Sequence, residues 1–484
     1  MKRMLLVVAA STSFACATTP KSSPTVEPLP NTSTKTSTQA QTKIATKPSR
    51  DIQGALSLVE TGRKLQQEKG EGGAEEAIAI YSQALKLDPE CAAALWEQGW
   101  SYQVINKWDE VIVVWEALER LDPKYPKLDV HFPIAKMRRD QARTLAELPE
   151  ATKLMPVEEE PRKGPTLSLS AVGDIQLGRA WPTARAKLPP GAGEIIFEKI
   201  KDKLNSTDIT FGNLETVLAD DGKSSKCGPR STQCYAFRVP TSYAKTLKDV
   251  GFDVLSIANN HTGDFGQDGR TKTIEALDKV GILHSGPIGD IATWEHKGLK
   301  IALVAFSTGG GVYRVQHVDV AKKLVADLDR SHDLVFVSFH GGAEGSKAAH
   351  VPQGVEMFLG ENRGNLRSFT HTVIDAGADL VLGHGPHLLR GMEIYKGRLI
   401  AYSLGNFTSW ETFNLRGALG ISAILKVKLA TNGVLLSADV DPVIIDKPGI
   451  PRHDDKNKAL KILRKLSKED FGSALLDEKG KYQR

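Results

Sequence analysis

Short apolar runs alternate with stretches of helical periodicity from Thr166 onward. Each run is about the length of a buried strand, and polar or charged residues follow it directly. Strands that alternate with helices are typical of an α/β fold built around parallel sheets. We therefore predict an α/β domain over residues 165–445, with strands at 167–172, 209–211, 252–257, 334–339 and 378–382.

A different pattern, with a period of 34 residues, precedes this domain. Tyr81 and Trp115 are 34 positions apart, and so are Pro89 and Pro123, each in a Leu-Asp-Pro phrase. The period resembles that of tetratricopeptide repeats, whose units are helix–turn–helix pairs. We predict an all-α, tetratricopeptide-like domain over 51–148. Two units are fewer than such cores usually need, so a closing helix is expected within 130–148.

The first 50 residues do not have the composition of a folded domain. Two basic residues precede the apolar run 4–10, and small residues lead to Cys16, which predicts an export signal over 1–16. In one interpretation Cys16 is acylated and anchors a lipoprotein to a membrane; in the other the signal is cut nearby and the protein is periplasmic. Residues 17–50, rich in Ser, Thr and Pro, are predicted to be a disordered linker. Both interpretations place the chain in the cell envelope.

Composition narrows the function classes. A net charge of +5 over 484 residues is too small to indicate nucleic-acid binding, and 40% hydrophobic with 25% charged residues is ordinary for a globular protein. Four cysteines are too few for a disulfide scaffold. Cys227 and Cys234 flank an apparent insertion and are predicted to close a local disulfide, the alternative being two thiols. The ranges 149–164 and 446–484 are predicted to be a linker and a charged tail. The amphipathic stretch 460–468 of that tail is expected to form a solvated helix that packs on the domain, the alternative being a surface that contacts anionic polymer or lipid.

The polar residues that follow the predicted strands suggest a metal site. In α/β sheets, ligands bind at the carboxyl ends of strands, so these residues are expected to converge. Carboxylates, an amide and imidazoles together suit Mn, Fe or Zn. These residues lie directly after the predicted strands and include Asp174, Glu215, Asn259, Asn260, His261, His340, His384 and His387.

Taken in order, these phrases resemble the bacterial CapA capsule-synthesis family, a branch of the calcineurin-like metallophosphoesterase superfamily. The resemblance covers residues 166–443 and rests on Gly173-Asp174-Ile175, Asn213-Leu214-Glu215-Thr216, Ala258-Asn259-Asn260-His261, His340-Gly341-Gly342-Ala343-Glu344 and Gly383-His384-Gly385-Pro386-His387. It implies two facing β-sheets flanked by helices, with the site at their rim.

The resemblance also implies roles for individual residues. Asp174 matches a ligand of a first metal ion, Glu215 a bridging carboxylate and Asn260 a ligand of a second ion. His261 matches a histidine that protonates a leaving group, and Arg179 is a candidate for holding an anionic substrate group. The remaining metal ligands implied are His340, His384 and His387.

One departure from the wider superfamily concerns Gln176, which stands where that superfamily has a histidine ligand. Its amide would be a weaker ligand, so the site is expected to bind either one ion or two. The expected activity is that of a phosphoesterase-like hydrolase or transferase acting on poly-γ-glutamate or a related anionic envelope polymer or its precursor. The alternative is a non-catalytic assembly factor that binds such a polymer and recruits a membrane synthase through residues 51–148.

Overall fold

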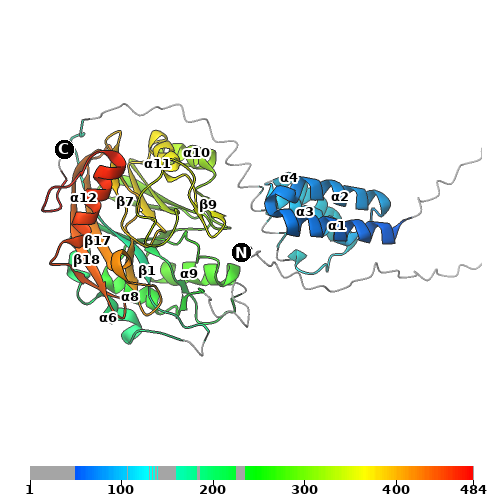
Figure 1. The fold of residues 1–484 in the computed structure, drawn as a ribbon, viewed down its shortest axis with the longest axis horizontal. Helices are drawn as coiled ribbons and strands as arrows, with labels where there is room; N and C mark the ends of the chain where they lie inside the picture. Colours follow the sequence, from blue (N-terminus) through cyan, green and yellow to red (C-terminus); the bar gives the residue numbers. More distant parts are fainter. Residues whose placement is uncertain are drawn as a thin grey trace, which may run out of the picture. The chain divides into compact units, whose positions relative to one another are not determined.

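The computed structural model describes residues 50–105, 107–129, 131–132, 135–136, 139, 160–182, 186–224 and 235–482. The chain divides into two compact units, residues 1–146 and 147–484 (Figure 1). The predicted signal with Cys16, most of both predicted linkers and the Cys227–Cys234 pair lie outside the described residues.

The smaller unit is entirely helical in its described part. Each first helix of a pair carries a glycine against an aromatic ring of the second helix. A Cβ on Gly62 would lie 2.4 Å from the Tyr81 ring, and one on Gly99 would lie 2.0 Å from Trp115 Nε1. The same kind of contact thus occurs in both helix pairs, and the tetratricopeptide identity stays a prediction. The helices are α1 (Ile52–Lys69), α2 (Ala74–Leu87), α3 (Ala92–Val104) and α4 (Trp108–Leu121).

Helical residues after α4 close the core of this unit. Leu128, Phe132 and Ala135 are buried and pack with Trp115 and Leu118 of α4. Their spacing of four and then three residues places them on one helical face. The described part of the expected closing helix thus contributes its apolar face to the core.

Two β-sheets form the larger unit. The first has the order β19-β18-β17-β1-β2-β5-β6, with β16 pairing with β1, and the second has the order β14-β15-β13-β10-β8-β7, with β9 pairing with β8. The first contains β1 (Leu167–Gln176), β2 (Ile209–Leu214), β5 (Val254–Ser256), β6 (Leu283–Ser285), β16 (Asn406–Ser409), β17 (Ile421–Leu429), β18 (Leu435–Asp446) and β19 (Ile450–His453). The second contains β7 (Ala292–His296), β8 (Leu299–Ser307), β9 (Tyr313–Arg314), β10 (Leu334–His340), β13 (Leu380–His384), β14 (Met392–Tyr395) and β15 (Arg398–Ala401). Two-stranded pairs are formed by β3 (Val217–Leu218) with β4 (Arg238–Val239) and β11 (Met357–Phe358) with β12 (Glu361–Asn362).

The two sheets face each other across one apolar core. Phe211 of the first sheet and Phe336 and Leu382 of the second belong to the same buried cluster. Helices cover the outer faces, with α8 and α9 on one side and α10 and α11 on the other (Figure 1). The predicted fold class is confirmed. The helices are α6 (Glu194–Phe197), α7 (Lys201–Leu204), α8 (Tyr243–Val250), α9 (Gly266–Val280), α10 (Val318–Asp329), α11 (Leu366–Asp375) and α12 (Lys458–Phe471).

Parallel pairing brings the carboxyl ends of the central strands together. In the first sheet β1, β2 and β5 run parallel, and Asp174 pairs in register with Asn213. In the second sheet β8, β10, β13 and β15 run parallel, and His340 pairs in register with His384. Each sheet therefore delivers polar residues to one edge.

The range 446–484, which composition marked as a charged tail, contains ordered elements of the larger unit. β19 adds a strand to the first sheet, and α12 buries Ala459, Leu460 and Leu463 in the core between the sheets. Charged residues dominate the sequence there because the amphipathic helix exposes its opposite face. This segment packs on the domain through α12.

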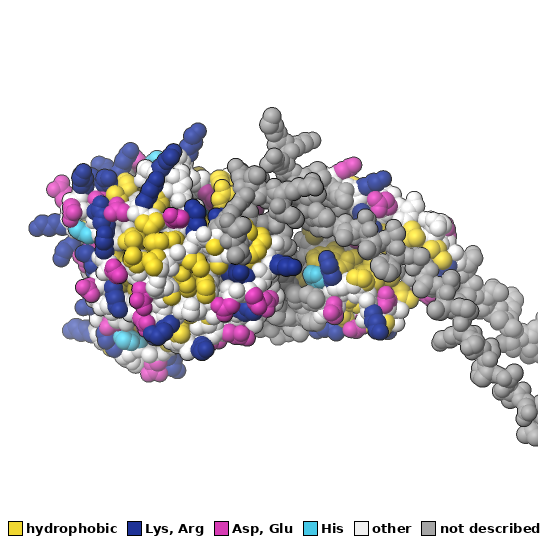
Figure 2. Space-filling model, turned by 90° about the horizontal axis from the view of Figure 1, so that it is seen from below, with side chains coloured by type: hydrophobic (Ala, Val, Ile, Leu, Met, Phe, Trp, Pro, Cys, Tyr) yellow, Lys and Arg dark blue, Asp and Glu magenta, His cyan; other side chains and the backbone are white. Residues whose placement is uncertain are grey.

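The surface carries charges of both signs. On the face in Figure 2, Lys and Arg side chains alternate with Asp and Glu around an apolar area of the larger unit, in keeping with the small net charge. Among the described residues, no helix combines the length and the apolar character needed to cross a membrane.

Candidate metal centre

Five polar side chains from both sheets meet at the edge formed by the strand ends. Asp174 lies near the end of β1, and Glu215 follows β2 directly. His340 and His384 are the last residues of β10 and β13, and His387 lies in the next loop. All of them except His387 are fully buried.

Close backbone packing explains the glycines beside these ligands. A Cβ on Gly173 would lie 1.9 Å from the carbonyl oxygen of Gly405, whose oxygen also accepts a hydrogen bond from Asp174 N–H. A Cβ on Gly385, whose φ is 113°, would lie 2.6 Å from the carbonyl oxygen of Gly341. His387 itself has φ of 61°, a strained conformation for a residue with a Cβ. Strain of this kind is concentrated at functional sites.

Glu215 lies at the centre of three imidazoles. Its Oε1 is 3.8 Å from the Nε2 atoms of His261, His340 and His387. These separations are longer than hydrogen bonds, so the carboxylate is surrounded by nitrogen atoms without being bonded to them.

Asp174 is held more tightly. Its Oδ2 lies 3.0 Å from His387 Nδ1, and its Oδ1 lies 3.4 Å from His384 Nδ1. The same Oδ1 accepts a hydrogen bond of 2.8 Å from the amide of Asn213. Three groups on separate strands and loops thus fix the orientation of this carboxylate.

Burial and neighbouring charges shift the pKa values of these residues in opposite directions. Burial acts to raise the pKa of Asp174, but the imidazoles of His384 and His387 outweigh it and hold that pKa well below its ordinary value. Burial raises the pKa of Glu215 well above its ordinary value, offset only in part by His387. Burial acts to lower the pKa of His387, yet Glu215 and Asp174 raise it to about 10. Burial also lowers the pKa of His340.

The donor set fits a divalent metal ion. Ligand atoms of Asp174, Glu215 and His340 all lie within 4.8 Å of one another. Both oxygens of Glu215 and the Nε2 atoms of His340 and His384 are buried and have no hydrogen-bond partner among the described residues. Buried polar atoms without hydrogen bonds are energetically unfavourable, and binding of a metal ion would account for them. Carboxylate and imidazole donors are suitable ligands for a divalent ion.

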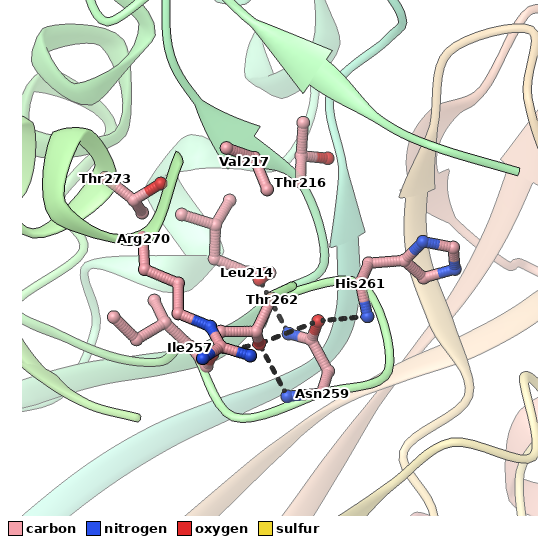
Figure 3. Close-up of a pocket in the computed structure, with 9 residues that line it drawn as sticks. All are labelled: Leu214, Thr216, Val217, Ile257, Asn259, His261, Thr262, Arg270 and Thr273. Carbon is pink, nitrogen blue, oxygen red and sulfur yellow. Dashed lines mark hydrogen bonds between the residues drawn. The ribbon is translucent and has the colours of Figure 1, made fainter. Parts of the chain in front are cut away.

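His261 stands beside the cluster in the loop after β5. Its Nδ1 is 2.7 Å from Asp264 Oδ2, which also accepts a hydrogen bond from Phe237 N–H. Asn259 fixes the start of the loop, since its side chain accepts from His261 N–H and donates to the Leu214 carbonyl. Figure 3 shows the ring of His261 pointing away from Arg270.

The remaining predicted site residues are placed differently. Gln176 Oε1 accepts hydrogen bonds from Gly178 N–H and from the Thr412 hydroxyl, which use both of its lone pairs. It therefore has no lone pair left for an ion in this arrangement. The half-buried Arg179 pairs through its backbone with Lys187, and Asn260 is half-buried between Asn259 and His261.

Sequence reasoning missed several residues that the structure brings to the site. Asn213 orients Asp174, and Asp264 holds His261. Glu344 Oε2 lies 4.0 Å from His387 Nε2, and its other oxygen is 2.9 Å from the buried Arg363. Asn213 and Glu344 lie within the phrases that carried the family resemblance, so their place in those phrases was the available signal.

Among solved structures, the chain is similar to the NAD nucleotidase of Haemophilus influenzae, with 13% identity, a TM-score of 0.29 and coverage of 61% of this chain and 55% of that one. It is also similar to the purple acid phosphatase PPD1 of yellow lupin, with 11% identity, a TM-score of 0.28 and coverage of 62% and 56%. Neither likeness is close enough to carry an argument.

Curated relatives are more similar in sequence. The capsule biosynthesis protein CapA of Bacillus anthracis is 27% identical over 334 residues, 66% of this chain and 77% of that protein. The PGA biosynthesis protein CapA of Bacillus subtilis is 28% identical over 323 residues, 63% and 78% respectively. A probable polyglutamine synthesis accessory protein of Mycobacterium tuberculosis is 30% identical over 229 residues, 42% and 55%.

A family model described as "Bacterial capsule synthesis protein PGA_cap" matches residues 168–410, half of the chain. The match contains the strands β1, β2, β5, β10 and β13 that deliver the buried carboxylates and imidazoles. The chain belongs to the PGA_cap family of bacterial capsule synthesis proteins.

Proposed function

We propose that this chain is an exported, metal-dependent hydrolase or transferase of capsule or related envelope-polymer biosynthesis. The observation that carries the proposal is the buried group of Asp174, Glu215 and His340, with orphaned donor atoms, beside His261. Relatives named for capsule and PGA biosynthesis support poly-γ-glutamate or a related anionic polymer, or its precursor, as the substrate.

The ligands we propose are Asp174, Glu215, His340, His384 and His387, with Asn260 as a further candidate. Gln176 is left out because its amide oxygen is already occupied. One or two ions of Mn, Fe or Zn suit this mixture of donors. A bound ion would act as a Lewis acid and would generate a nucleophile from water at neutral pH.

The residues of the chain itself supply proton transfer and orientation. Asp264 Oδ2, 2.7 Å from His261 Nδ1, orients the imidazole so that its Nε2 can deliver a proton to a leaving group. The carboxylate of Asp264 is itself fixed by Phe237 N–H. Asn213 keeps Asp174 oriented toward His384 and His387. Arg179 is proposed to hold an anionic group of the substrate.

Two measurements test this proposal, first the metal content and then the turnover. The full-length protein should retain about one or two metal ions per chain by elemental analysis, and a variant combining Asp174→Ala with His384→Ala should lose them. His261→Ala should keep its metal, while turnover of a phosphoester panel and of poly-γ-glutamate falls by about 10²–10⁴-fold. A folded wild-type protein that takes up no metal would contradict the proposal of a metal-dependent enzyme.

The helical unit supports a second function, that of a non-catalytic assembly factor that recruits a membrane synthase. Its paired helices form a separate compact unit with its own core. Metal retention without turnover on any substrate, together with loss of partners when residues 51–148 are deleted, would favour this alternative. Export and acylation of Cys16 are part of both proposals and are tested by mass analysis of the mature N-terminus.

A further inference from the structure

Gln176 connects two segments of the larger unit. It ends β1, two residues after Asp174, and its side chain is fully buried. The amide nitrogen donates to the carbonyl of Gly178 at 2.8 Å, and the amide oxygen accepts from the hydroxyl of Thr412 at 2.5 Å. The side chain therefore anchors the loop after β16 to the strand that carries a proposed metal ligand.

Other hydrogen bonds fix the same loop. Ser409 Oγ lies 3.1 Å from the Thr412 hydroxyl and accepts a hydrogen bond of 2.7 Å from Phe413 N–H. The carbonyl of Gln176 accepts one from Trp410 N–H. These contacts determine where the backbone of Phe413 lies, and so where its ring can reach.

The ring of Phe413 lies against the site. Its centroid is 4.6 Å from that of His387 and 5.5 Å from that of Phe237, which in turn is 4.6 Å from His261. Phe237 is buried, whereas Phe413 is half-exposed. The proposed ligand His387 and the proposed acid His261 are thus linked by an aromatic wall, and Phe413 is the part of it that solvent reaches.

We propose that Phe413 is a substrate-contacting residue, with Gln176 and Thr412 as the residues that position it. The ligand class is an oxyanion that binds the metal cluster and carries an apolar group directly attached to it, which packs on the ring. This inference rests on the proposed metal site, and it adds a specificity element that no metal ligand provides.

Two phosphonates that differ only in the apolar group isolate this contact. Methylphosphonate and phenylphosphonate present the same oxygens, so calorimetric titration of the Mn²⁺-loaded full-length protein measures the contribution of the phenyl group. An aromatic pair contributes enough for roughly a twofold to tenfold preference for phenylphosphonate. We expect that preference in the wild-type protein.

Variants then locate the contact. Phe413→Ala should abolish the preference, while Phe413→Tyr should keep it. Thr412→Val should reduce the preference, and Thr412→Ser, which retains the hydroxyl, should restore it. Phe471→Ala is the matched control, because this half-exposed ring stacks on Tyr402 instead. Metal content should be unchanged in every variant.

The outcomes separate this inference from the proposed function. If the wild-type protein retains no Mn²⁺, the proposed metal-dependent function and the role of Phe413 are both overturned. If it retains Mn²⁺ but binds the two phosphonates equally or not at all, the role of Phe413 is overturned and the metal site stands. A preference that survives Phe413→Ala, or that Phe471→Ala also removes, overturns it as well.

Discussion

Two buried ionisable side chains in the larger unit, those of Arg390 and Glu215, differ in how their polar atoms are hydrogen-bonded. Arg390 is fully buried and forms two hydrogen bonds with Glu356, at 2.9 and 2.7 Å. It also donates to the carbonyls of Ala348 and Ala343, while Glu356 accepts from Ala343 N–H. Glu215, equally buried, has no hydrogen-bond partner for either oxygen among the described residues.

The difference indicates that Arg390 with Glu356 stabilises the fold without a ligand, whereas Glu215 is suited to bind one. A fully bonded buried pair needs nothing further, and removing one partner leaves a charge stranded. A buried carboxylate without hydrogen bonds destabilises the ligand-free protein, so it points to a ligand that interacts with its oxygens. Burial by itself would not have distinguished them.

The largest effect is expected from breaking the satisfied pair. Arg390→Ala leaves Glu356 buried without its partner, which typically costs about 3–5 kcal/mol of unfolding free energy. Urea denaturation monitored by circular dichroism measures this. Replacing both residues, Arg390→Met with Glu356→Leu, should recover most of the loss, and a double variant as unstable as the single one would contradict this account.

An intermediate effect is expected at the unsatisfied carboxylate. Glu215→Gln should lower metal affinity by at least about 100-fold, since even residues that only support metal ligands cost about 10–100-fold when removed. Without metal, its unfolding free energy should change by less than about 1 kcal/mol, because burial raises the pKa of Glu215 and so lowers the cost of replacing its carboxyl with a neutral amide of the same shape. A metal-free variant as unstable as Arg390→Ala would erase the contrast between the two groups.

The smallest effect is expected at a group nearer the surface, His284 with Asp290 and Asp278. Burial acts to lower the pKa of His284, but hydrogen bonds to the two carboxylates outweigh it and raise the pKa above 6.5. Because the folded pKa is raised, the stabilisation is complete below about pH 6.5 and is lost as pH rises through the folded value. His284→Gln should therefore cost less than about 1 kcal/mol at pH 5.5 and still less at pH 9, by urea denaturation in EDTA.

Much of the candidate site could be predicted because its residues follow strands that the apolar pattern reveals. Asp174, Glu215, His340 and His384 lie at the carboxyl ends of predicted strands, and parallel pairing explains their convergence. The two-sheet arrangement, by contrast, came from the resemblance, since periodicity does not say which strands pair.

The residues that were missed act through contacts that no local pattern records. Asp264 and Phe413 lie in loops that long-range hydrogen bonds hold in place: Phe237 N–H donates to Asp264, and the hydroxyl of Thr412, next to Phe413, donates to Gln176. Gln176 shows the reverse: its position after Asp174 suggested a ligand, yet its amide is bonded to Thr412, 236 positions away in sequence. Proximity in sequence to a ligand does not determine where a side chain is bonded.

The proposed ligands come from both sheets: Asp174 and Glu215 follow strands of the first, and His340 and His384 end strands of the second. An ion held by all four would act as a clasp across the seam between the sheets, and its binding free energy would add to their packing. The melting temperature should therefore rise with the metal concentration around the protein. The lifetime of the folded chain would then depend on the metal supply of its compartment as well as on its sequence.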